Sequence, residues 1–298
     1  MRGLISLSDR RTALKSVAAF ALGCALAVSV AARAQVSSEM VSFETATVRD
    51  GGATVKGELR IPGTGAAPRP AVLVLHTSSG YNRDNISVHY IERLNRLGIA
   101  TLRINMFSYD RPKSTRVVMP HAYGALLYLA ADPRFDPRRI GVLGFSYGGV
   151  MSVVMASEEV TQEYTGGKAR FAAHLALYPV CTAHLGLLSG SNKVYAASTY
   201  QRVTGAPVHI LTGELDSYDE PDSCPKFVAA LPEGVREHFA VTVYPGAHHV
   251  FDEPGANRQH RDEYARNGIA VTRYNADAAA KAWAFAEQFF SQALAAKP

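Results

Sequence analysis

The stretch Ile140-Gly141-Val142-Leu143-Gly144-Phe145-Ser146-Tyr147-Gly148-Gly149 decides the fold of this chain. An apolar run leads into a Gly-x-Ser-x-Gly pattern, and a helix-like run follows it to residue 156. This order is typical of a nucleophile elbow, where a buried strand turns sharply into a helix and exposes a serine. A side chain at Gly144 or Gly148 would collide with the neighbouring strand or helix. We therefore predict that Ser146 is a nucleophile; the alternative is an ordinary turn with a surface serine.

Strands and helices alternate on both sides of this turn. Residues 41–48 and 53–61 predict two strands joined at Asp50-Gly51-Gly52, a hairpin signal. Apolar patterns predict further strands at 71–75, 99–104, 139–145, 171–177, 208–212 and 240–244, and helices at 86–97, 117–131 and 276–294. Such alternation predicts an α/β fold with a mostly parallel, doubly wound sheet, helices on both faces and an N-terminal antiparallel hairpin. We expect one domain over residues 40–296.

The first 34 residues have the features of an export signal. Four basic residues precede residue 16, residues 16–30 are apolar, and Ala32-Arg33-Ala34 matches a cleavage site. We predict a signal peptide over residues 1–34, cleaved after Ala34, and a periplasmic or secreted protein. Arg10-Arg11 is compatible with the twin-arginine route, and the general secretory route stays open. A lipoprotein site at Cys24 would need Ala21 to replace the usual leucine.

The charge of the chain belongs largely to this signal. The formal net charge is +5, and residues 1–34 carry five of the basic residues and one aspartate, so the mature chain retains about +1. We therefore expect no nucleic-acid partner, and no stable membrane association after cleavage.

Two cysteines remain in the mature chain, Cys181 and Cys224. Two cysteines in an exported chain permit one disulfide. Both follow consecutive predicted strands, which favours a bridge between them; the alternative is two separate buried thiols.

A serine hydroxyl needs a base, usually a histidine held by a carboxylate. In this type of fold the acid and then the histidine follow the serine along the chain, each on a loop after a strand. Asp216 lies just past the strand at 208–212, and we predict it as the acid. Glu214 comes too early, and Asp219 and Asp222 lie further into the loop. After the strand at 240–244 come His248 and His249, of which only one can face Ser146.

A tetrahedral oxyanion also needs hydrogen-bond donors. One is expected to be the Tyr147 N–H, and the second to come from the loop after the first core strand, His76-Thr77-Ser78-Ser79-Gly80. We expect the Thr77 amide, with Ser78 as the next choice. The His76 side chain is a candidate for the pocket lining or, alternatively, a structural residue at the strand end.

These segments together resemble the dienelactone hydrolase family of the α/β-hydrolase superfamily. The resemblance spans residues 45–295 and rests on residues 136–149, Gly213-Glu214-Leu215-Asp216, residues 244–252 and the last helix from residue 273. It implies a catalytic triad of Ser146, Asp216 and His249, which resolves the choice between the two histidines. It also implies a small pocket and attack on esters or lactones without a metal or organic cofactor.

The resemblance adds one expectation and two departures. An arginine that holds a substrate carboxylate is typical of the family, and Arg111 is the best match; the alternative is a loop arginine paired with Asp110. Dienelactone hydrolase itself has a cysteine where this chain has Ser146. It also has a glutamate beside the oxyanion loop, where His76 or Thr77 stands here. We therefore do not expect dienelactone as the natural substrate.

The leading hypothesis is an exported serine hydrolase that cleaves small carboxylic esters or lactones through an acyl-enzyme. The same triad on the same fold could act on peptide, thioester or polymer-linked ester bonds, with the polar residues 253–275 as a candidate cap over the pocket. A non-catalytic binding protein on a hydrolase scaffold is the alternative of another class. The presence of all three triad residues argues against it.

Overall fold

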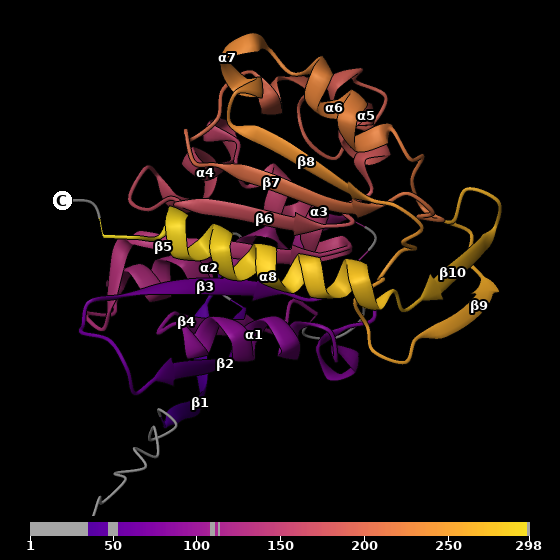
Figure 1. Ribbon diagram of the computed structural model, residues 1–298. Helices are drawn as coiled ribbons and strands as arrows, with labels where there is room; N and C mark the ends of the chain where they lie inside the picture. Colours follow the sequence, from indigo (N-terminus) through magenta and orange to yellow (C-terminus); the bar gives the residue numbers. More distant parts are fainter. Residues whose placement is uncertain (1–34, 47–52, 108–110, 113, 297–298) are drawn as a thin grey trace, which may run out of the picture. The chain divides into compact units, whose positions relative to one another are not determined.

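The computed structural model describes residues 35–46, 53–107, 111–112 and 114–296 (Figure 1). The chain divides into two units, Met1–Arg33 and Ala34–Pro298, and only the second is described below. The predicted signal peptide and the turn at Asp50-Gly51-Gly52 therefore fall outside the described residues. Among the helices in the described part of the chain, none has the length and apolar character required to cross a bilayer.

Eight strands form one sheet in the order β1-β2-β4-β3-β5-β6-β7-β8. The strands are β1 (Val36–Glu44), β2 (Thr54–Pro62), β3 (Arg69–Leu75), β4 (Ala100–Ile104), β5 (Phe135–Phe145), β6 (Ala173–Leu177), β7 (Val208–Gly213) and β8 (Phe239–Tyr244). β2 runs antiparallel to β1 and to β4, and the strands from β4 to β8 are parallel. This confirms the predicted mostly parallel sheet with an N-terminal antiparallel hairpin. β1 begins at Val36, before the predicted start at residue 41. Its first five residues are exposed and show no apolar alternation, so no sequence pattern marked them as a strand.

Helices cover both faces of the sheet, as Figure 1 shows for α1 and α8 on the near face. The neighbouring β3 residues Val72 and Leu73 illustrate the division, because Val72 packs in the cluster of α1 and α8 and Leu73 in that of α2 and α3. The helices are α1 (Ser87–Arg96), α2 (Thr115–Ala131), α3 (Tyr147–Val154), α4 (Glu158–Thr165), α5 (Cys181–Leu188), α6 (Ser223–Ala230), α7 (Glu233–Arg236) and α8 (Ala276–Ala293), with 3₁₀ turns η1 (Tyr81–Arg83) and η2 (Ala197–Tyr200). Helices α4 to α7 were not predicted from the sequence, because four to eight residues are too few to show a helical period.

A second sheet contains only β9 (Asn257–Arg261) and β10 (Ile269–Arg273). In Figure 1 this hairpin lies beyond the ends toward which the β7 and β8 arrows point. Every residue of β9 is exposed, so the strand has no inward-facing apolar set that could have revealed it in the sequence. In parallel sheets the carboxyl ends of the strands meet at one edge, where ligands bind. The hairpin therefore stands at the edge where a site is expected.

Candidate active site

The turn from β5 into α3 holds Ser146 in a strained conformation. Its backbone φ of 49° and ψ of −110° lie in a region that few side chains adopt. A Cβ on Gly144 would come within 2.0 Å of the Gly148 carbonyl oxygen, and one on Gly148 within 2.4 Å of the Leu75 carbonyl oxygen. The Ser146 N–H donates to the Leu177 carbonyl at 2.9 Å, which fixes the turn against β6.

Ser146, His249 and Asp216 form one hydrogen-bonded chain. The Ser146 Oγ–H donates to His249 Nε2 at 2.9 Å, and the His249 Nδ1–H donates to Asp216 Oδ2 at 2.7 Å. Asp216 Oδ1 also accepts from the Tyr218 N–H at 2.8 Å. The three side chains reach this arrangement from the loops after β5, β7 and β8, and each residue is at most 9% exposed. The structure thus brings His249, and not His248, to the serine.

Two tyrosine rings hold the His249 imidazole. The centroids of Tyr178 and Tyr218 lie 4.9 and 4.5 Å from that of the imidazole. The backbone of His249 is also bridged to Thr272 of β10. Such packing restricts the ring to one orientation, which a proton-transferring histidine requires. Neither tyrosine carried a motif in the sequence that marked it for this position.

Asp252 is a buried carboxylate behind the histidine loop, three residues after His249. It accepts hydrogen bonds from Tyr90 Oη at 2.6 Å and from Tyr178 Oη at 2.8 Å. Burial raises the pKa of Asp252 to about 6, although the two tyrosine hydroxyls oppose this shift. The carboxylate therefore links α1, the residue that follows β6 and the histidine loop in one polar cluster within the core.

The oxyanion-loop residues divide into those that face the cavity and one that does not. Thr77, Ser78 and Tyr147 line the cavity beside Ser146. In the described part of the chain, the backbone N–H groups of Thr77 and Tyr147 donate to no other protein group. His76 lies outside the lining, which corrects the expectation that its side chain lines the pocket. Its Nδ1–H donates to the Thr77 carbonyl at 2.7 Å and its Nε2 accepts from the Met106 N–H at 3.1 Å, so both nitrogens bind backbone.

The cavity that opens over Ser146 has a volume of about 750 Å³. Arg111 lies exposed at its mouth, with the guanidinium 5.4 Å from the centre of the Tyr264 ring. Arg83 and Arg258 also line the cavity, and Arg258 is paired with Glu253. The mouth is therefore polar and carries several cations, while the interior wall between α3 and α5 is mostly apolar.

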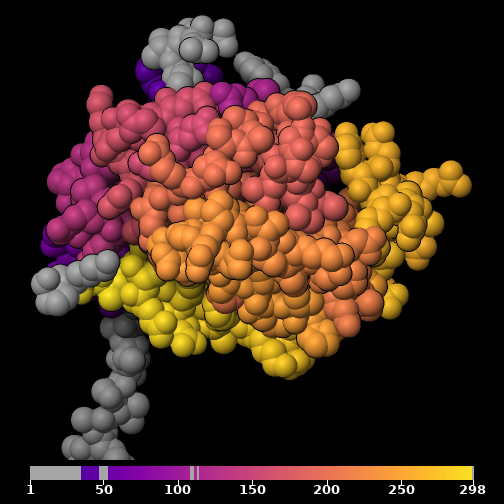
Figure 2. Space-filling model, turned by 90° about the horizontal axis from the view of Figure 1, so that it is seen from above, coloured from indigo at the N-terminus to yellow at the C-terminus, as the bar shows by residue number. Residues whose placement is uncertain are grey.

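The β9–β10 hairpin closes one side of this cavity. It contributes Arg258, His260, Asp262, Tyr264 and Thr272 to the lining. Figure 2 shows the gold-coloured residues of this region projecting at the edge of the molecule. Tyr218 Oη donates to Asp262 Oδ2 at 2.7 Å, and Ser217 Oγ accepts from the Val271 N–H at 3.1 Å. The predicted polar segment 253–275 is thus tied to the loop that carries Asp216.

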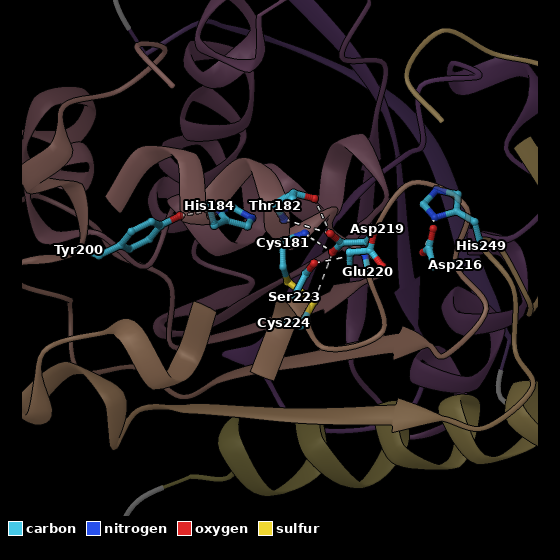
Figure 3. The surroundings of a disulfide bond; sticks show 10 residues. All are labelled: Cys181, Thr182, His184, Tyr200, Asp216, Asp219, Glu220, Ser223, Cys224 and His249. Atoms are coloured by element: carbon cyan, nitrogen blue, oxygen red, sulfur yellow. Dashed lines mark hydrogen bonds and ion pairs between the residues drawn. A yellow bond between two sulfur atoms is a disulfide. The ribbon is translucent and has the colours of Figure 1, made fainter. Parts of the chain in front are cut away.

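A disulfide joins Cys181 at the start of α5 to Cys224 in α6 (Figure 3). Asp219, buried beside the bridge, accepts from the N–H groups of Cys181 and Thr182. Burial raises the pKa of Asp219, against the effect of these hydrogen bonds. The bridge and Asp219 together anchor residues 216–224 to the first turn of α5, so Asp219 is a structural carboxylate rather than an acid facing His249.

Among the described residues, one group of three side chains has the spacing of metal ligands, namely Cys181, Asp219 and Cys224. Both of its sulfurs belong to the disulfide, and a metal would need them as thiolates. The donor set therefore does not fit a metal while the bridge is intact.

Replacement of both bridged cysteines by alanine should lower the free energy of unfolding by about 2–5 kcal/mol, because the bridge closes a loop between residues 43 apart. Chemical denaturation of the double variant and of the wild type measures this difference. Dithiothreitol should destabilise the wild type and leave the double variant unchanged. Equal unfolding free energies for the two proteins would contradict a stabilising role of the bridge.

Asp252→Asn should change how stability depends on pH. The pKa of Asp252 is about 6 in the folded protein against an ordinary 3.8, so the folded state holds this proton more tightly than the unfolded chain. Its contribution to stability is complete below pH 3.8 and is lost as the pH rises through 6. The unfolding free energy of the wild type minus that of the variant should fall by up to about 3 kcal/mol across this window. A difference that stays constant between these pH values would contradict the assignment.

The family model described as "Dienelactone hydrolase family" matches residues 57–294. A search of curated proteins found no match. Among solved structures, Est1E from Butyrivibrio proteoclasticus is 15% identical with a TM-score of 0.59, covering 86% of this chain and 99% of its own. Dienelactone hydrolase from Anabaena variabilis ATCC 29413 is 20% identical with a TM-score of 0.57, covering 87% and 98%.

A further similar structure is the dienelactone hydrolase-like promiscuous phosphotriesterase P91 from metagenomic libraries. It is 19% identical with a TM-score of 0.52 and covers 86% of this chain and 98% of its own. At these identities the structures establish the shared α/β-hydrolase fold, and the family match covers most of the chain. The resemblance drawn from the sequence is thereby confirmed: this chain belongs to the dienelactone hydrolase family.

Proposed function

We propose that this chain is a serine hydrolase that cleaves carboxylic esters or lactones through an acyl-enzyme. The observation that carries the proposal is the continuous chain of hydrogen bonds from Ser146 Oγ through the His249 ring to Asp216, at 2.9 and 2.7 Å. Ser146 and His249 line a cavity of about 750 Å³, a size that suits a small molecule. Membership of a hydrolase family supports the same reaction class.

In the first half-reaction the Ser146 hydroxyl attacks the substrate carbonyl. His249 Nε2 accepts the hydroxyl proton as the Oγ–C bond forms, and Asp216 stabilises the resulting imidazolium through Nδ1–H. The negative charge moves to the former carbonyl oxygen. We assign its stabilisation to the N–H groups of Tyr147 and Thr77, which are free to donate and lie at the cavity wall.

Collapse of the tetrahedral intermediate breaks the bond to the leaving alcohol, which takes the proton from His249. The product is an acyl ester on Ser146. A water molecule then gives a proton to His249 and attacks this ester, and a second collapse returns the proton to Ser146 Oγ. His249 acts first as a base and then as an acid in each half-reaction. The ring orientation that Tyr178 and Tyr218 maintain is therefore needed in every proton transfer.

A small ester substrate is favoured over a long polymer, because the hairpin of β9 and β10 forms part of the cavity wall. One similar solved structure, 16% identical with a TM-score of 0.53, is Est1E with ferulic acid bound. Ferulic acid is a ligand of Est1E, and the cavity of this chain, at about 750 Å³, is large enough for a molecule of that size. Arg111 at the mouth is a candidate contact for an anionic group of the substrate.

We also propose that the chain is exported and that residues 1–34 are removed. The disulfide between Cys181 and Cys224 supports this, because such bridges form and persist in oxidising compartments. Expression of the full chain in a bacterial host and N-terminal sequencing of the periplasmic and culture fractions should show a chain that begins at Gln35. A full-length chain confined to the cytoplasm would contradict the proposal.

Ser146→Ala should abolish ester hydrolysis without unfolding the protein. We expect a loss of at least about 10⁴-fold in kcat for p-nitrophenyl acetate, because the nucleophile is removed while the fold is kept. Intact-protein mass after treatment with a fluorophosphonate should show one adduct on the wild type and none on the variant.

Ser189→Ala is the matched control, since Ser189 is an exposed serine at the end of α5 and outside the cavity lining. It should keep both the adduct and the turnover. A folded wild type that gains no adduct and hydrolyses no ester would favour a non-catalytic binding protein. Faster turnover of peptide amides than of esters would favour the alternative bond types.

A further inference from the structure

Tyr178 has a backbone conformation that few side chains adopt. It directly follows β6, and its φ of 40° lies in the left-handed region. Val250, the residue after His249, has a φ of 57°. Strained residues of this kind persist only where the surrounding structure holds them, and they gather at functional sites. Two of them accompany the catalytic base, one against its ring and one in its own loop.

The contacts of Tyr178 form a closed circuit with the histidine loop. The Tyr178 ring packs against the His249 imidazole with centroids 4.9 Å apart, and its hydroxyl donates to Asp252 Oδ1 at 2.8 Å. Asp252 in turn is joined to His249 through two residues, Val250 and Phe251. The Phe251 ring also contacts that of Tyr178, with centroids 5.7 Å apart. A shift of the Tyr178 ring would therefore remove one wall from the imidazole, and the hydrogen bond to Asp252 opposes that shift.

Tyr90 binds the same carboxylate through its second oxygen. The Tyr90 hydroxyl donates to Asp252 Oδ2 at 2.6 Å from α1, and its ring contacts Phe145 with centroids 5.0 Å apart. Of the two tyrosines bound to Asp252, Tyr178 is the one whose ring contacts His249. Both tyrosines and the carboxylate are fully buried, and all three lie outside the cavity lining. The two hydroxyls thus share an acceptor and a degree of burial, and differ in their contact with the base.

The charge of Asp252 has no basic partner. Among the residues that the structure describes, no lysine or arginine forms an ion pair with this buried carboxylate, which is held by the two tyrosine hydroxyls. Burial raises the pKa of Asp252 to about 6, and a positive charge on His249 opposes this shift. The attraction between two charges is mutual. The Asp252 anion therefore favours the imidazolium that forms when His249 takes the proton of Ser146.

Other groups around Asp252 and His249 are titratable or charged, namely Asp84, Tyr90, Arg93, Tyr178, Asp216, Tyr218 and Tyr244. Burial raises the pKa of the four tyrosines above its ordinary value, so their hydroxyls stay protonated near neutral pH. Asp216 binds the imidazole directly through Nδ1. The tyrosines thus cannot replace Asp252 as the anion behind the ring.

We propose that Asp252 and Tyr178 are positioning residues of the active site: through Tyr178 the Asp252 carboxylate keeps the His249 imidazole in place, and its charge stabilises the imidazolium. The inference rests on the hydrolase function proposed above. It assigns a use to a buried charge that costs stability whenever it is ionised. Because both residues lie outside the cavity lining, they act on the proton transfers and not on substrate binding.

Tyr178→Phe and Tyr90→Phe form a matched pair. Each substitution removes one hydroxyl from Asp252 and keeps the ring. Both variants are compared at about pH 8, where Asp252 is ionised. Tyr178→Phe should lower kcat for p-nitrophenyl acetate by about 10-fold and leave KM unchanged, because the wall against His249 loosens. Tyr90→Phe should keep a kcat close to that of the wild type. Titration with the fluorophosphonate gives the active-site concentration on which each kcat is based.

Asp252→Asn tests the charge separately. The amide keeps the size of the side chain and one acceptor oxygen but carries no charge. At about pH 8 the wild type should exceed this variant in kcat per active site by about 10-fold. Below pH 6 Asp252 is itself neutral, so this ratio should fall as the pH decreases through 6. A carboxylate with a structural role alone would give a ratio that does not change with pH.

Three outcomes would overturn the inference. The first is an unchanged kcat in a folded Tyr178→Phe variant. The second is an equal loss of kcat in Tyr178→Phe and Tyr90→Phe, which would make the cluster a stabilising element alone. The third is a constant ratio of wild type to Asp252→Asn between about pH 5 and about pH 8. If Asp252→Asn does not fold, the two tyrosine variants decide. A wild type that is not labelled at Ser146 would instead refute the proposed function itself.

Discussion

The close approach of β3, β5 and α3 at Gly144 and Gly148 is the constraint on which the rest of the site depends. A Cβ at either position would meet a backbone oxygen at 2.0 or 2.4 Å, so the turn closes only with glycine. The turn holds Ser146 at a φ of 49°, a strain that the packed sheet beneath must compensate. This strained turn places the Ser146 hydroxyl beyond the edge of the sheet, at the start of α3, where a base can reach it.

The base is held from several directions at once. Asp216 orients one nitrogen of His249, Tyr178 and Tyr218 contact its ring, and β10 contacts its backbone. Two buried carboxylates extend this support into the core. Asp252 ties the histidine loop to two tyrosines, and Asp219 ties the acid loop to α5 beside the disulfide. Buried polar networks of this kind give rigidity only when their members are paired, which these are.

Substrate choice depends on parts of the chain that lie outside the catalytic residues. The parallel sheet fixes where Ser146, Asp216 and His249 meet, and this arrangement is common to many hydrolases. Residues of α3, α5 and the β9–β10 hairpin line the cavity and so decide which group fits beside the triad.

The sequence by itself determined the main sheet, the elbow at Ser146 and the acid Asp216 through local signals: an apolar strand, two glycines flanking a serine, and an acid just after a strand. It narrowed the base to His248 or His249, and the choice of His249 came from the family resemblance. Only the tertiary structure decided that His76 binds backbone groups and that Asp252 meets Tyr90 across 162 residues of sequence. Such contacts depend on how distant segments pack, and side-chain type or spacing along one segment carries no record of that packing.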